Sequence, residues 1–288
     1  MNKSEPKTPK SRTKAVMDKL RADIDRVDTA LLNLIAERMG LAAAVRQAKS
    51  GANVWRPSRE ESHVRDLAKK ANGVSPELVS HIWAELTSAS LTLQGPIGLH
   101  IALSCGGGGD ALSQWSLVRD RFGASIPAHT YPMASGALAT AHADLEGVAV
   151  LPAPGGMNNW WTALGPNGAC ADMNILAALP RIGAWDWPVA VAVSKAVREP
   201  SGDDITLLYI EAGTLPASLT LEQMFAGAGF NAVRRAEVDG QYLYSVAGYV
   251  DDEDVRLKAI RSQLASLKIV GVLPCPIVLP IGGEVSDV

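Results

Sequence analysis

The segment 13–50 reads TKAVMDKLRADIDRVDTALLNLIAERMGLAAAVRQAKS and decides the fold of the N-terminal region. Its apolar residues recur at alternating steps of three and four, the spacing of a helix that packs against other helices. This stripe consists of Met17, Leu20, Ile24, Val27, Leu31, Leu34, Leu41, Val45 and Ala48. We therefore predict one long helix over residues 13–50.

Arg38 interrupts this apolar stripe between Leu34 and Leu41. A guanidinium in a buried stripe is costly unless an anion meets it. Lys49 follows eleven residues later, on a similar face and roughly 16 Å along the helix axis. Two cations on the buried side of one helix predict an anionic ligand inside a helical bundle.

A second, shorter helix is expected to follow, ending near residue 73. Ser58 and Glu61 have the spacing of a capping box, in which Ser58 is the N-cap. That assignment places Arg59 and Glu60 in the first turn of the helix.

The third helix is predicted to begin at Ser75, with Pro76 at its first helical position, and to end at Gly95. Its apolar stripe turns polar at Ser90 and Gln94, which stay close to the same face. Residues 13–95 thus form an all-α domain of three helices.

Composition limits the classes of partner. The chain has 288 residues, 47% of them hydrophobic, and a net charge of −3, which is ordinary for a globular protein and gives no reason to expect nucleic acid. No apolar run approaches the ~20 residues of a membrane-spanning helix. Three scattered cysteines fit a reducing compartment better than a disulfide framework or a metal site. We expect a cytoplasmic protein with a disordered tail over residues 1–12.

From about residue 97, short apolar runs alternate with amphipathic segments. Strands are predicted over 98–104, 126–131, 148–152 and 188–197, with helices over 110–122 and 135–143. This alternation predicts a parallel α/β layer over residues 97–200. The glycine run 106–109 follows a strand, but it lacks the Lys-Ser/Thr of a P-loop and the spacing of a dinucleotide fingerprint, so nucleotide binding is disfavoured.

Residues 203–280 show the order strand, helix, strand, strand, helix, strand. Asp239-Gly240 is a strong two-residue hairpin signal between the two middle strands. The order is that of a ferredoxin-like βαββαβ module, a plan that by itself fixes no function.

The helical domain holds a polar set that packing does not require. Its members are Arg21, Arg38, Lys49, Arg59, Glu60, Ser90 and Gln94. Apart from Arg38, each of them also fits an ordinary surface or helix-end role. Together they are cation-rich, with one carboxylate and one amide, which suits a small dianion that carries a hydroxyl. The set contains no nucleophile–base pair and no metal cluster, so we expect neither cofactor nor metal, and a reaction that needs positioning and charge stabilisation.

Residues 13–95 resemble the all-helical, AroQ-class chorismate mutases. The resemblance is carried by residues 20–25 (LRADID), 34–39 (LIAERM), 45–49 (VRQAK), 57–61 (PSREE) and 88–94 (SASLTLQ). The family catalyses the Claisen rearrangement of chorismate to prephenate, a unimolecular pericyclic step.

The resemblance implies a role for each polar residue. Arg21 and Arg38 would hold the two carboxylates of the substrate, assisted by Ser90. Lys49 and Gln94 would donate hydrogen bonds to the ether oxygen, which gains negative charge as the C–O bond breaks. Arginine forks suit carboxylates, and donors aimed at a developing oxyanion favour the transition state.

Glu60 would accept a hydrogen bond from the ring hydroxyl, and Arg59 would orient that region. Arg56 departs from the family pattern, because some members carry an acidic residue there that contacts substrate. The departure concerns the hydroxyl subsite and not the reaction.

Arg21 and Arg38 are too far apart on one helix to bind one small molecule. Seventeen residues correspond to roughly 26 Å along the axis, whereas chorismate is less than about 10 Å across. We therefore expect an intertwined homodimer in which each active site takes residues from both chains.

Residues 97–280 resemble, more weakly, a prephenate dehydratase followed by an ACT-like module. The expected Thr-Arg-Phe motif is replaced by WPVAVA at 187–192, and Ala153-Pro154-Gly155-Gly156 stands where an Glu-Asn-Ser-like turn should follow a strand. The Glu-Ser-Arg-Pro sequence for phenylalanine is missing too, with residues 235–238 (RAEV) in its place. We infer a degenerate dehydratase-like domain, with an aromatic amino-acid effector as an open question.

Three alternatives remain. The chain could be a bifunctional chorismate mutase–prephenate dehydratase, or a non-catalytic helical dimer that senses a metabolite of the aromatic pathway. A lyase acting on isochorismate is disfavoured, because Lys49 and Glu60 are both present.

Overall fold

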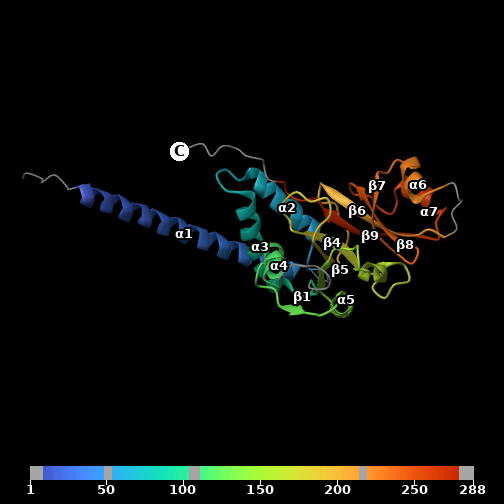
Figure 1. Cartoon of the computed structure of the whole chain (residues 1–288). Coiled ribbons are helices and arrows are strands. Elements are labelled where there is room, and N and C mark those ends of the chain that lie inside the picture. The colour runs from blue at the N-terminus through green and yellow to red at the C-terminus, as the bar shows by residue number, and fades with distance from the viewer. Residues whose placement is uncertain (1–8, 49–53, 104–110, 214–218, 279–288) are drawn as a thin grey trace, which may run out of the picture. The chain divides into compact units, whose positions relative to one another are not determined.

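The computed structural model describes residues 9–48, 54–103, 111–213 and 219–278. The chain divides into two compact units, unit 1 with residues 1–49 and unit 2 with residues 50–288 (Figure 1). The predicted domain boundary after residue 95 does not coincide with the boundary between the two units, which lies between residues 49 and 50. The second and third helices belong to unit 2, where they pack against strand and helix elements of the α/β region.

Unit 1 is a single helix, α1 (Pro9–Ala48), of 40 residues. It begins at Pro9, and proline is well suited to a first helical position. Residues 9–12 are therefore helical, so the prediction of a disordered tail is wrong for these four residues. The predicted apolar stripe is present, and its eight large side chains from Met17 to Val45 are between 41% and 64% exposed. Lys49 lies outside the described residues.

Helix α2 (Pro57–Lys70) begins differently from its prediction. Arg56 is the N-cap residue and makes no side-chain capping bond, while Pro57 occupies the first turn. The predicted capping box is therefore wrong. Ser58 and Glu61 are each only 3% exposed, and the Glu61 carboxylate accepts a hydrogen bond from Arg181 at 2.9 Å.

Helix α3 (Pro76–Gln94) confirms its prediction. The Ser75 side chain accepts a hydrogen bond from the backbone N–H of Leu78 at 3.2 Å, and Pro76 takes the first helical position. The helix ends at Gln94, with Gly95 as the C-cap.

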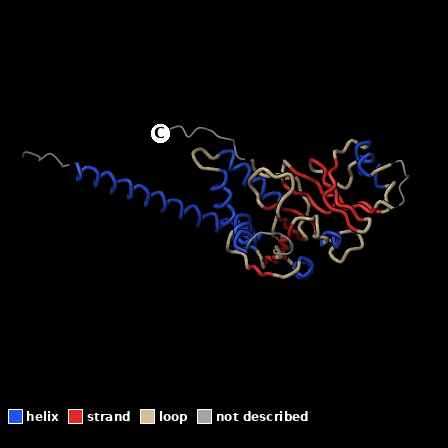
Figure 2. The backbone as a smooth tube through the Cα atoms, viewed as in Figure 1, coloured by secondary structure: helices blue, strands red, loops and turns tan. Residues whose placement is uncertain are grey.

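Unit 2 is built on one nine-stranded sheet in the order β2-β1-β3-β5-β4-β9-β6-β8-β7 (Figure 2). The strands of its first half are β1 (Gly98–Ile101), β2 (Ala128–Thr130), β3 (Gly147–Pro152), β4 (Asn174–Leu179) and β5 (Ala190–Ser194). The prediction of a parallel layer is confirmed for β1, β2 and β3 and is wrong for β5. β1 is parallel to β2 and β3, but β5 is antiparallel to both β3 and β4. β4 was not predicted, and the glycine run 106–109 lies outside the described residues.

The second half of the sheet has the ferredoxin-like order predicted for it. Its elements are β6 (Asp204–Glu211), α6 (Leu221–Gly227), β7 (Ala232–Val238), β8 (Gln241–Ala247), α7 (Val255–Arg261) and β9 (Ser266–Pro274). All neighbouring strands within this half are antiparallel. Asp239 and Gly240 both have positive φ, 49° and 77°, as a two-residue hairpin turn requires.

The two halves are not separate domains, because β4 and β9 pair in parallel at Ile175 and Gly271. A Cβ at Gly271 would lie 2.4 Å from the Ile175 carbonyl oxygen, so this close approach requires glycine. The predicted regions 97–200 and 203–280 therefore share one sheet.

Helices cover both faces of the sheet. Along one face, α5 (Ala134–Ala143) and the 3₁₀ helix η1 (Trp160–Leu164) pack on a single core that crosses both halves. On the other face, α3 and α4 (Ala111–Phe122) contribute to the core over β1, β3, β4 and β5. There α6 and α7 form a separate core over the ferredoxin-like half.

None of the helices that the structure describes combines the length and the apolarity needed to span a membrane.

Candidate active site

Helix α1 carries two of the predicted site residues, Arg21 and Arg38. The Arg21 guanidinium lies 3.8 Å from the Asp18 carboxylate, and its side chain is 70% exposed. Seventeen residues of straight helix separate the two arginines by roughly 26 Å. The helix alone does not bring them together, as the sequence predicts.

Helix α3 carries Ser90 and Gln94. The Ser90 hydroxyl is buried and donates to the Leu86 carbonyl at 2.6 Å, the usual back-bond of a helical serine. Gln94 is the last residue of the helix and is partly exposed.

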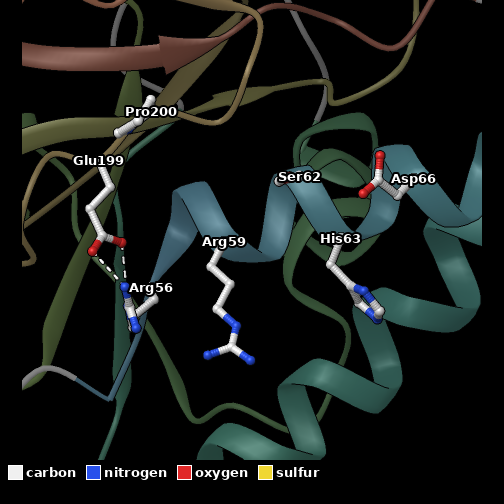
Figure 3. Close-up of a pocket in the computed structure, with 7 residues that line it drawn as sticks. All are labelled: Arg56, Arg59, Ser62, His63, Asp66, Glu199 and Pro200. Carbon is white, nitrogen blue, oxygen red and sulfur yellow. Dashed lines mark hydrogen bonds and ion pairs between the residues drawn. The ribbon is translucent and has the colours of Figure 1, made fainter.

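Helix α2 presents Arg59 and Glu60 on different sides, since consecutive helical residues are about 100° apart. Arg59 is exposed and projects into an open cavity of 510 Å³ (Figure 3). The cavity is lined by Arg56, Arg59, Ser62, His63, Asp66, Glu199 and Pro200. Ser90 and Gln94 are not among the described residues that line it.

Arg56, the departure from the family pattern, is paired across this cavity. Its Nη2 donates to Glu199 Oε1 at 2.5 Å, and its Nε donates to Glu199 Oε2 at 3.3 Å (Figure 3). A bidentate pair neutralises the arginine. An acidic group therefore lies beside this position after all, supplied by the α/β region and not by the helix.

Glu60 points into a buried cluster of charges. Its Oε1 accepts from Arg121 Nη1 at 2.5 Å and from Arg181 Nη2 at 2.6 Å. Its Oε2 accepts from the indole N–H of Trp55 at 3.1 Å. The Glu60 side chain is 9% exposed, and those of the two arginines are 1% and 2% exposed.

Glu61 completes the cluster. It accepts from Arg181 Nε at 2.9 Å and lies 3.8 Å from Arg121 Nη2, while Arg181 Nη1 donates to the Ser80 hydroxyl at 3.2 Å. We call Glu60, Glu61, Arg121 and Arg181 the four-charge cluster. Two cations and two anions balance, which is the condition for burying such groups.

The cluster keeps Glu60 ionised. Burial opposes the charge and by itself would raise the pKa of Glu60. Arg121 and Arg181 outweigh that effect, and hydrogen bonds from Trp55 and Arg121 add to theirs, so the pKa lies below its usual value. A carboxylate in this state can only accept hydrogen bonds.

Neither Arg121 nor Arg181 was predicted from the sequence as a site residue. Arg121 lies in α4, three residues after the buried Val118 and beside the buried Phe122. A cation at a core position is the same signal that singled out Arg38. Arg181 follows β4, which was not predicted, and offers no comparable local signal.

The comparisons with known proteins concern mainly the helical region. Residues 20–95 match the family model "Chorismate mutase type II". Over 88 residues the chain is 36% identical to the T-protein of Enterobacter agglomerans, a match that covers 29% of this chain and 24% of the T-protein. The match thus spans about a quarter of that relative.

Two solved structures are similar to part of this chain at low identity. One is GqqA, described as a novel type of quorum quenching acylase, with a TM-score of 0.44, 16% identity, and coverage of 62% of this chain and 95% of that one. The other is prephenate dehydratase from Arthrobacter aurescens in complex with L-Phe, with a TM-score of 0.44, 13% identity and coverage of 64% and 93%.

The family match begins one residue before Arg21 and ends one residue after Gln94, so it contains all seven predicted site residues. Residues 20–95 of this chain are therefore similar to the chorismate mutase type II family.

Proposed function

We propose that the protein is a chorismate mutase that rearranges chorismate to prephenate by electrostatic stabilisation, without covalent catalysis. The observation that carries this proposal is the family match over residues 20–95, whose sequence contains every expected polar residue. Arg21 and Arg38 bind the carboxylates with help from Ser90, Arg59 orients the ring side of the substrate, and Glu60 accepts from the ring hydroxyl. Lys49 and Gln94 donate to the ether oxygen.

Purified protein is expected to consume chorismate and release prephenate, in proportion to protein concentration. The same assay should include a phenylpyruvate measurement. Binding of chorismate without turnover would favour the metabolite-sensing dimer instead, and direct formation of phenylpyruvate would favour the bifunctional mutase–dehydratase.

The active form is a homodimer with shared active sites. Two observations support this part of the proposal. One is the separation of Arg21 from Arg38 on a single helix. The other is the exposed apolar stripe of α1, which a second copy paired antiparallel would cover twice by two-fold symmetry.

Complementation tests the shared site. Arg21→Ala and Arg38→Ala proteins are mixed, denatured and refolded together, so that each mixed dimer has one site with both arginines and one site with neither. Recovery of up to half the activity per mixed dimer supports sharing. A mixture that stays as inactive as its parents, despite confirmed subunit exchange, contradicts it.

The α/β region is degenerate as a dehydratase. Dehydration of prephenate needs a positioned proton donor, and β3 is followed by Ala153-Pro154-Gly155-Gly156, which offers none. The ferredoxin-like half keeps the strand order of an ACT-like module, so binding of an aromatic amino acid there is the regulatory function to test. Chorismate turnover that is unchanged by millimolar phenylalanine, tyrosine or tryptophan would count against regulation of this kind.

A further inference from the structure

The Glu60 carboxylate is held mainly by residues that lie outside the mutase-like segment. Arg121 comes from α4, 61 positions along the chain, and Arg181 follows β4, 121 positions along. We propose that Arg121 and Arg181 are positioning residues for the mutase reaction, because they fix the carboxylate that accepts from the ring hydroxyl of the substrate. The inference rests on the proposed function and extends the active-site machinery into the α/β region.

The geometry leaves Glu60 with acceptor capacity for substrate. A carboxylate offers about four lone-pair sites. Arg121 and Arg181 both use Oε1, and Trp55 uses one site on Oε2. The second lone pair of Oε2 has no donor among the described residues, and it is this lone pair that the proposal assigns to the ring hydroxyl.

Stability alone does not account for the four-charge cluster. A buried ion pair is often no more stabilising than apolar residues of the same volume. Arg121 is also imperfectly satisfied, since its Nε and Nη2 have no hydrogen-bond partner among the described groups. What an apolar replacement could not supply is an oriented, ionised carboxylate at Glu60.

The same contacts set the pH range over which Glu60 can act. Arg121 and Arg181 hold the pKa of Glu60 below its usual value despite burial. The ring-hydroxyl acceptor is then present above that lowered pKa and is lost only as the pH falls through it. Weakening either arginine raises the pKa and moves the loss to higher pH.

The test compares Arg181→Lys and Arg121→Lys with a matched control, Arg235→Lys, in the full-length protein. Arg235 of β7 is also nearly buried, at 10% exposure, and donates to Ser245 of β8 and to Asp186, which lies between β4 and β5. Lysine keeps the charge but loses the planar fork that reaches two partners. Misplacement of a binding group by about 1 Å can cost about 100-fold. We expect kcat/KM for chorismate to fall about 10- to 100-fold in the first two variants and to stay within about twofold in the control.

The pH profile separates positioning from a merely structural role. The acid limb of kcat should move to higher pH in Arg181→Lys and Arg121→Lys and stay in place in Arg235→Lys. Folded lysine variants with unchanged kcat/KM and unchanged acid limbs would overturn the inference. Absence of mutase activity in the unchanged protein would overturn the proposed function together with it.

Two further measurements decide the question if the lysine variants do not fold. The double variant Arg181→Gln/Glu61→Gln removes one cation and one anion together and leaves Arg121 paired with Glu60. The acid limb of its kcat should still lie at higher pH than that of the unchanged protein. In the unchanged protein, the acid limb of kcat should lie below the ordinary glutamate pKa of about 4.3. A limb at or above that value would contradict the inference.

Discussion

The apolar stripe of helix α1 keeps its eight large side chains at least 41% exposed, whereas α2, with 14 residues against 40, buries two carboxylates against two guanidinium groups. Both helices belong to the chorismate mutase type II match. The contrast teaches that the two helices depend on different partners. The stripe of α1 needs a partner that the proposal assigns to a second copy, while α2 already has its partner in the α/β region of the same chain.

The largest expected effect on turnover concerns the donors to the ether oxygen. Lys49→Ala and Gln94→Ala should each lower kcat by on the order of 100-fold or more, because each removes a hydrogen-bond donor to a developing oxyanion. Both variants should melt close to the unchanged protein. The control is Lys69→Ala, an exposed lysine in the last turn of α2, which should keep its activity.

Steady-state kinetics give kcat, and a thermal melting curve gives the stability of each variant. Unchanged kcat in both Lys49→Ala and Gln94→Ala would show that these two residues do not donate to the ether oxygen. An amide does not titrate, so a steep rise of activity below neutral pH would also argue against the role of Gln94.

A charge in the apolar stripe of α1 tests the dimer side of the comparison. Leu31→Glu should raise the dissociation constant of the dimer by on the order of 1,000-fold, since two-fold symmetry loses two buried leucines and adds two carboxylates. Sedimentation over a range of concentrations measures the change. Asn33→Glu, two positions along on the polar side, is the matched control. Equal dissociation constants for the two variants would show that the stripe is not the dimer contact.

Neutralising one carboxylate of the four-charge cluster tests whether the cluster holds α2 to the α/β region. Glu61→Gln leaves Arg181 buried with one carboxylate fewer and should lower the free energy of unfolding by about 3 kcal/mol. Urea denaturation gives the value. The control is Glu85→Gln on α3, where the exposed carboxylate accepts from the Ala124 backbone N–H at 3.0 Å; its loss should be below about 1 kcal/mol. Similar midpoints for the two variants would mean that the cluster contributes little.

Acid should weaken the same cluster in the unchanged protein. The folded-state pKa of Glu60 is depressed, so its contribution to stability is fully present above the unfolded-state pKa of about 4.3 and is lost as the pH falls through the folded-state value. Glu60→Gln should therefore show a shallower decline of stability below about pH 4.3 than the unchanged protein. Parallel declines in the two proteins would contradict this assignment.

The smallest expected effect concerns the N-terminal side-chain cap, which α3 has and α2 lacks. Ser75 caps α3 through its side chain, whereas α2 begins without a side-chain cap. Ser75→Ala should lower the free energy of unfolding by about 1 kcal/mol, and Ser75→Asp should restore it. Equal losses for alanine and aspartate would show that the hydroxyl does not act as a cap.

Local patterns predicted much of this fold. The stripe of α1, the cap at Ser75, the Asp239-Gly240 turn and the ferredoxin-like order each depend on residues close in sequence, and each is present in the structure. β4 was missed because NILAAL is buried at five of its six positions and shows no polar alternation. The capping box failed for a different reason: Ser58 and Glu61 fit it locally, but Glu61 has a tertiary partner 120 positions away.

The candidate site shows the same limit. The seven predicted residues can be found from charge in an apolar pattern and from the family resemblance. The partners of Glu60 cannot, because contacts over 61 and 121 positions follow from the sheet order and not from local periodicity.

The pairing of β4 with β9 has a consequence for dividing the chain. β4 lies inside the sheet, between β5 and β9, and its last five residues are buried. Removing residues 203–288 would turn it into an open edge strand with unpaired N–H and C=O groups and an apolar sequence. Such an edge is a template for intermolecular pairing, and natural sheets protect it with charges, prolines or bulges. A shortened protein ending near residue 200 should therefore aggregate, so the ferredoxin-like half also acts as the sheet's protection against self-association.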